Sequence, residues 1–117
     1  MFKIDGTNIT LTRGDTLIAE VKATVKSTGE DYIPTAQDHV RFAMKRNQMD
    51  AGRKRFIDEE PLLEVSVPTD TMILRIEADA TKEFDFGQYW YDIEITFEDG
   101  TVDTFIEGIL TLTKEAD

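Results

Sequence analysis

The amino-acid sequence predicts an all-β protein, folded as a two-sheet antiparallel sandwich of about seven strands. Two observations carry this prediction. Apolar and polar residues alternate along most of the chain, which is the period of a half-buried strand, and apolar residues nowhere keep a helical period for long. Turn-forming residues separate these alternating segments at short intervals, as in β-sandwiches.

The first half of the chain holds three strand patterns. Ile9 and Leu11 alternate before the tripeptide Arg13-Gly14-Asp15, which we interpret as a tight turn. One long strand is predicted over residues 17–25 because every second residue is apolar. A central strand follows at 39–45, and the polar stretch 47–60 is predicted to be the longest loop.

Two strands over 62–67 and 72–76 are predicted to form a hairpin around a turn at Pro68-Thr69-Asp70. Residues 78–84 favour a single helical turn that Asp79 can cap, and this turn is expected to cross between the sheets. The region therefore supplies a hairpin and then a crossover.

The last hairpin joins residues 88–97 to 102–113 through Asp99-Gly100, a dipeptide suited to a two-residue type I′ turn. That turn fixes the register of both faces. The predicted inner pairs are Phe97–Val102, Ile95–Thr104, Ile93–Ile106, Tyr91–Gly108 and Tyr89–Leu110. The predicted outer pairs are Thr96–Asp103, Glu94–Phe105, Asp92–Glu107 and Trp90–Ile109.

The run Asp85-Phe86-Gly87-Gln88-Tyr89-Trp90-Tyr91 resembles the D-x-G-x-Y-x-C motif that opens strand F of immunoglobulin domains, with Tyr91 at the cysteine position. The resemblance implies an immunoglobulin-like sandwich in which Asp85 and Gly87 shape the corner. It also implies that the hydroxyl of Tyr89 bonds upstream backbone. The motif cysteines and a strand-C tryptophan are missing, so the resemblance concerns the fold and not antibody-like ancestry.

A second resemblance covers most of the chain through the opening 9–16, the middle Asp38-x-Val40-x-Phe42, and a tail from Gly87-x-Tyr89-x-Tyr91 to Gly108. These segments are similar to small proteins of tailed-phage and prophage structural gene clusters in Gram-positive bacteria, including the amino-terminal domain of phage baseplate upper proteins. The resemblance implies a tail or virion assembly role, with this protein itself or other virion proteins as partners. It also implies synthesis in the bacterial cytoplasm, and a place in the virion after assembly.

Composition narrows the function classes. A chain of 117 residues is expected to form one domain, 1–117, and its net charge of −11 argues against nucleic acid and anionic membranes as partners. Its start has no apolar signal region, and no run is long enough for a membrane span. Residues 41–55 are the exception in charge, with six basic residues against one acidic.

We expect no enzyme activity, cofactor or metal. The chain has no cysteine and one histidine, His39, which suits a polar strand face better than a metal site. Ser27 and Ser66 are the only serines and have no recognisable base beside them. The 24 acidic residues are too many for any carboxylate pair to point to acid–base catalysis.

The candidate interface is an outer face of the last hairpin with Trp90, Phe105 and Ile109, apolar side chains set among acids. The basic residues Arg53, Lys54 and Arg55 form a second candidate surface. The alternative function is a carbohydrate-binding or adhesion module that stacks a sugar on Trp90. A structural explanation also stays open, in which Arg41 and Lys45 pair with Asp92 and Glu94 across neighbouring strands.

Overall fold

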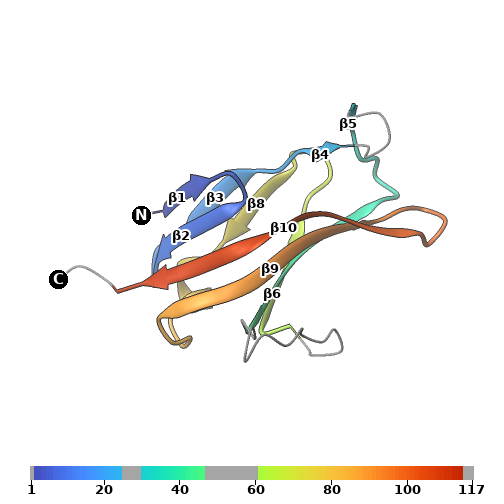
Figure 1. The fold of residues 1–117 in the computed structure, drawn as a ribbon. Helices are drawn as coiled ribbons and strands as arrows, with labels where there is room; N and C mark the ends of the chain where they lie inside the picture. The colour runs from blue at the N-terminus through green and yellow to red at the C-terminus, as the bar shows by residue number, and fades with distance from the viewer. Residues whose placement is uncertain (1, 25–29, 47–60, 115–117) are drawn as a thin grey trace, which may run out of the picture.

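The computed structural model describes residues 2–24, 30–46 and 61–114. These residues form two facing layers of β-strands, a sandwich-like arrangement that confirms the predicted all-β class (Figure 1). The larger layer is a six-stranded sheet with the order β1-β2-β10-β9-β6-β7. Its strands are β1 (Phe2–Asp5), β2 (Asn8–Thr12), β10 (Val102–Thr113), β9 (Gly87–Thr96), β6 (His39–Arg46) and β7 (Leu63–Val67).

The second layer is a small sheet of β3 (Leu17–Glu20) and β8 (Ile73–Ile76). A further short pair joins β4 (Ala23–Thr24) to β5 (Asp31–Tyr32). The described residues thus contain ten strands where about seven were predicted. One reason is that β3 and β4 divide the long strand predicted over 17–25, and at the break the N–H of Val21 donates to the carbonyl of Met72 at 2.8 Å.

The core lies between the two layers and is built from alternate residues of the facing strands. The rings of Phe42 and Tyr91 stack at its centre, 5.3 Å apart. Burying each large apolar side chain stabilises the fold by about 1.5–3 kcal/mol. The buried residues of the alternating segments therefore hold the two layers together. Its most fully buried members are Phe42, Leu11, Leu17, Met44, Leu74, Ile76, Ile95, Leu110 and Leu112.

The β9–β10 hairpin has the predicted strands but a different turn. The carbonyl of Phe97 accepts from Gly100 N–H at 2.9 Å, and the N–H of Phe97 donates to Thr101 at 2.8 Å. Three residues therefore separate the last hydrogen-bonded pair. Gly100 has a φ of +92° and Asp99 does not take a positive φ, whereas a type I′ turn requires one at both positions. The type I′ prediction is wrong.

This longer loop shifts the register beside the turn by one residue. Val102 lies opposite Thr96, and Thr104 lies opposite Glu94, so the four predicted pairs nearest the turn are wrong. A β-bulge between Thr104 and Ile106 then undoes the shift. Every predicted pair beyond the bulge is confirmed, from Ile93–Ile106 to Tyr89–Leu110.

Strands β7 and β8 do not form the predicted hairpin. β7 pairs with β6 in the large sheet, while β8 pairs with β3 in the small sheet, so residues 68–72 cross between layers. In this crossing the N–H of Met72 donates to the carbonyl of Pro68 at 2.8 Å. Alternation fixes which face of a strand is buried but leaves its neighbour open, which is why the sequence pattern misled here.

A 3₁₀ turn, η2 (Ala78–Thr81), leads from β8 to β9 and crosses between the sheets as predicted. Its N-cap is Glu77, without a side-chain cap bond, so the capping role predicted for Asp79 is wrong. Asp79 instead forms an ion pair with Lys82 at 3.1 Å.

Strand β2 pairs with β1 in an antiparallel hairpin and with β10 in parallel, which the sequence did not indicate. The Arg13-Gly14-Asp15 turn then leads from β2 to β3, with Asp15 N–H donating to Thr12 at 3.0 Å. The guanidinium of Arg13 lies over the Phe86 ring, 4.1 Å from its centroid, and donates to the carbonyl of Phe84. The tripeptide thus has the structural use expected of a turn.

Candidate binding face

The outer face of the large sheet is the side turned away from β3 and β8. Trp90 stands on it in β9, with Ile109 of β10 opposite on one side and Lys45 of β6 opposite on the other. The side chain of Trp90 remains 39% exposed, while Ile109 is partly buried. Trp90 and Ile109 therefore form an adjacent apolar pair, as the register predicted.

Phe105 was predicted to lie beside this pair on the outer face, and that prediction is wrong. It is the extra residue of the bulge in β10, and it packs, partly buried, against the hydrophobic core. Thr104 takes the place opposite Glu94 that was predicted for Phe105. The bulge is the cause, because one inserted residue changes the direction of the side chain that carries it. The apolar part of the outer face is therefore narrower than expected.

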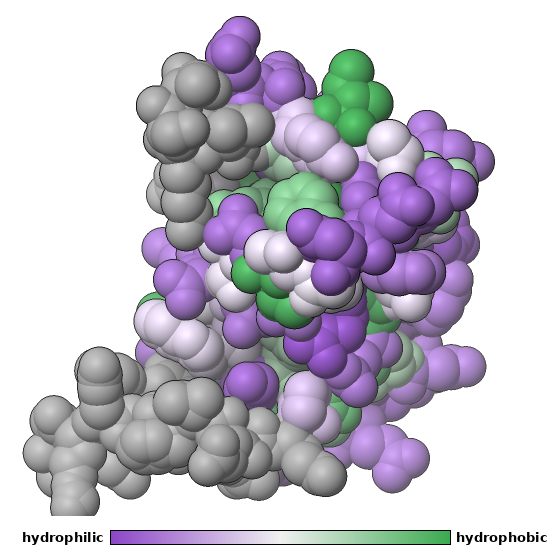
Figure 2. Space-filling model, turned by 90° about the vertical axis from the view of Figure 1, so that its right-hand side faces the viewer, coloured by the Kyte–Doolittle hydropathy of each residue, from purple (hydrophilic) through white to green (hydrophobic). Residues whose placement is uncertain are grey.

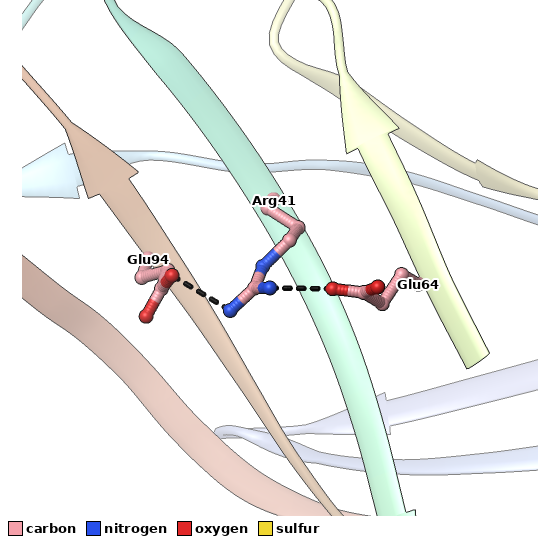
Figure 3. A network of polar contacts seen from close by, with 3 residues as sticks. All are labelled: Arg41, Glu64 and Glu94. Atoms are coloured by element: carbon pink, nitrogen blue, oxygen red, sulfur yellow. Dashed lines mark hydrogen bonds and ion pairs between the residues drawn. The ribbon is translucent and has the colours of Figure 1, made fainter. Parts of the chain in front are cut away.

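Arg41 bridges two strands on this face (Figure 3). Its Nη2 donates to Glu94 Oε1 of β9 at 2.7 Å, and its Nη1 donates to Glu64 Oε2 of β7. The predicted neighbourhood of the basic strand and the acidic strand is thereby confirmed. Since all three side chains are partly exposed, each ion pair contributes at most about 1 kcal/mol.

Asp92 lies between Glu107 of β10 and Ala43 of β6. Burial raises the pKa of its carboxyl group, and the neighbouring cations Lys45 and Arg41 act in the opposite direction. Its Oδ1 and the Nε of Arg41 are buried without a hydrogen-bond partner among the described residues. The middle of the outer face thus holds a carboxylate in an unfavourable environment.

The corner residues lie at the start of β9. The hydroxyl of Tyr89 donates to the main-chain carbonyl of Asp85 at 2.7 Å, as the motif predicted. Gly87 between them has a φ of +132°. Asp99 caps the opposite turn, where its Oδ1 accepts from Thr101 N–H at 2.9 Å and this bond lowers the pKa of Asp99. These two hydrogen bonds stabilise the corner before β9 and the turn before β10.

One polar cluster escaped the sequence analysis. The carboxylate of Asp38 accepts from Thr35 N–H at 2.9 Å and from the Tyr32 hydroxyl at 2.7 Å, and these bonds lower its pKa. The Tyr32 ring meets Phe97 edge-on at 5.5 Å. The turn signal at 35–38 could have revealed the Asp38–Thr35 bond, but nothing local indicated Tyr32. The cluster links residues 32–38, which precede β6, to Phe97 at the end of β9.

The remaining predicted contact residues, Arg53, Lys54 and Arg55, lie outside the described residues. A shallow cavity of about 220 Å³ opens elsewhere, between the β3–β4 break and Met72, with Ile33 at its lining. Figure 2 shows the end of the molecule that carries the β9–β10 turn, where the surface is mainly hydrophilic and hydrophobic side chains appear in small separate areas.

Within 2–24, 30–46 and 61–114, no group of three or more His, Cys, Asp or Glu side chains is placed to hold a metal ion. No helix in that part of the chain is long and apolar enough to span a membrane. His39 is exposed at the start of β6.

No protein-family model matches the chain, and a search of the curated proteins finds no significant match.

Proposed function

We propose that the chain is a non-enzymatic assembly module of phage or prophage tails and baseplates, acting through protein–protein contacts. The observation that carries the proposal is the 39% exposed indole of Trp90 beside Ile109 on the outer face. A partly exposed aromatic anchor with an apolar neighbour and charged surroundings is typical of a protein interface. Partners of this face are other virion proteins or a second copy.

An immunoglobulin-like topology is part of the proposal. In the large sheet β10, β9, β6 and β7 follow the order of strands G, F, C and C′, and β3 and β8 take the places of B and E. The Tyr89–Asp85 bond has the form of a tyrosine corner. Strand D, which borders E in that fold, has no counterpart among the described residues.

The test is incorporation into particles. Tail particles purified after induction of the prophage in the encoding bacterium should contain the chain, detected by mass spectrometry. A genomic Trp90→Glu change should lower its incorporation at least tenfold, whereas Ile33→Glu adds the same charge at an exposed site outside the outer face and should have no effect. Absence of the wild-type chain from such particles contradicts the proposal, and normal incorporation of Trp90→Glu contradicts the role of this face.

The exposed indole also suits the alternative, a carbohydrate-binding module, because an indole on a flat sheet can stack against a sugar ring. A glycan array separates the two functions. Glycan binding by the wild type that is lost in Trp90→Ala, together with absence from particles, would favour the carbohydrate function over assembly.

A further inference from the structure

The edge of β8 that faces away from β3 has unpaired main-chain groups. The two strands run antiparallel in an uninterrupted register, from Leu17 opposite Ile76 to Glu20 opposite Ile73. One position beyond the strands, Val21 N–H donates to the carbonyl of its opposite residue, Met72, at 2.8 Å. This bond fixes which residues of β8 point toward β3.

Hydrogen-bonded and non-hydrogen-bonded pairs alternate along an antiparallel ladder. Because Val21–Met72 is a bonded pair, Ala19–Leu74 and Leu17–Ile76 are bonded pairs as well. The main-chain N–H and C=O groups of Ile73 and Arg75 must then point away from β3. No other residue in the described ranges hydrogen-bonds these groups.

The side chains beside this edge are partly apolar. Ile73 is 38% exposed and Ile18 of β3 is 46% exposed, both on the surface of the small sheet that faces away from the core. The register sets Ile18 beside Arg75 and Glu20 beside Ile73. An unpaired edge with exposed β-branched side chains is a template for the addition of another strand.

We propose that β8 pairs antiparallel with β8 of a second copy, about a two-fold axis at Leu74. This axis places Ile73 opposite Arg75 of the second copy, so the outward-pointing groups of both residues meet. Each of these symmetric pairs exchanges two main-chain hydrogen bonds. The two small sheets thereby join into one four-stranded sheet with an isologous interface.

Charge favours the β8 edge over the opposite edge of the same sheet. Pairing through β3 about Ala19 would bring Glu20 of both copies to neighbouring positions, and β3 carries no cation to offset them. On β8 the charge of Arg75 is already paired with Glu77 at 2.7 Å. At the β8 edge the charge of Arg75 is therefore balanced by Glu77, even though the whole chain is strongly acidic.

Solution mass of the full chain tests the proposal, measured by size-exclusion chromatography with light scattering over a concentration series. The wild type should approach twice the monomer mass. Arg75→Pro removes the outward N–H without touching a bond to β3, and proline is tolerated at such an edge position, so this variant should be a folded monomer. Arg75→Ala keeps the main chain and should dimerise like the wild type.

Amide hydrogen exchange measured by NMR gives a second readout that does not depend on a variant. The amides of Ile73 and Arg75 should exchange at least tenfold more slowly as concentration rises, while those of Leu74 and Ile76 should be protected throughout. A wild type that stays monomeric, or equal loss of the dimer in Arg75→Ala and Arg75→Pro, overturns the proposal. A dimer lost in Trp90→Glu but kept in Arg75→Pro overturns it too, and places self-association on the outer face instead.

Discussion

The hydroxyl of Tyr91 donates a hydrogen bond to the main-chain carbonyl of Thr7, and so joins β9 to the turn between β1 and β2. Gly108 lies opposite Tyr91 on β10, directly beneath that turn. A Cβ atom at position 108 would lie 2.1 Å from the Thr7 carbonyl oxygen. One small and one large residue thus hold the turn between β1 and β2 against β9 and β10.

Tyr91→Phe should lower the free energy of unfolding by about 1 kcal/mol, because it removes this hydrogen bond and leaves the packing of the ring on Phe42 intact. Urea denaturation followed by circular dichroism measures the change. An unchanged unfolding midpoint would mean that water replaces the tyrosine hydroxyl without cost.

Gly108→Ala should lower the free energy of unfolding by about 1–3 kcal/mol, because the added methyl group meets main-chain atoms of Thr7 that cannot rotate away. The amide chemical shifts of residues 2–12 should change along with the loss of stability. Thr104→Ala, on the same strand but in the part that does not pair with β2, provides the control and should leave those shifts in place. Wild-type stability of Gly108→Ala would show that the turn can move freely.

Asp38→Asn should change how stability depends on acid. The bonds from Thr35 N–H and the Tyr32 hydroxyl hold the folded-state pKa of Asp38 below the unfolded value of about 3.9. Its stabilising contribution is therefore fully present above that unfolded value and is lost as pH falls through the folded pKa. Urea unfolding from pH 7 to pH 2 should show a shallower acid decline for Asp38→Asn, and parallel profiles would contradict this assignment.

Asp92→Asn should have the opposite effect. Burial raises the pKa of Asp92 in the folded state, so its charged form opposes folding at neutral pH and this penalty disappears as pH falls through the raised pKa. The variant should be as stable as the wild type or more stable at pH 7, and the difference should vanish in acid. Clear destabilisation by Asp92→Asn at pH 7 would mean that its contacts with Lys45 and Arg41 outweigh burial.

Some features of the β9–β10 hairpin were predictable from the sequence and others were not. Alternation identified the residues of β9 that face the core and those of β10 beyond the bulge, and Asp99-Gly100 located the turn. Nearer the turn it was wrong, because Val102, predicted inside, is exposed and Phe105, predicted outside, packs against the core. The extra loop residue and the bulge at Phe105 had no local signal, because each depends on how the sheet twists. The pairing far from the turn was right because these two deviations cancel in register.

The outer face was also predictable in part, because alternation along β6 and β9 showed which side chains point outward. The ion pair of Arg41 with Glu94 follows from two adjacent strands with opposite charges, and the structure confirms it. The partner strand of β8, by contrast, was not predictable, since alternation in 72–76 suits pairing with β7 and with β3 equally well. The burial of Asp92 also depends on tertiary neighbours that no sequence window contains.

The parallel pairing of β2 with β10 has a consequence for how the chain acquires its structure. Ile9 pairs with Leu110, and such contacts between the two ends dominate the rate at which a small protein finds its native topology. We expect slow folding compared with a domain built from local hairpins. On the ribosome, β2 can pair with β10 only after β10 has been synthesised and has left the exit tunnel. The sheet therefore cannot be completed at β2 until residues 102–113 have emerged.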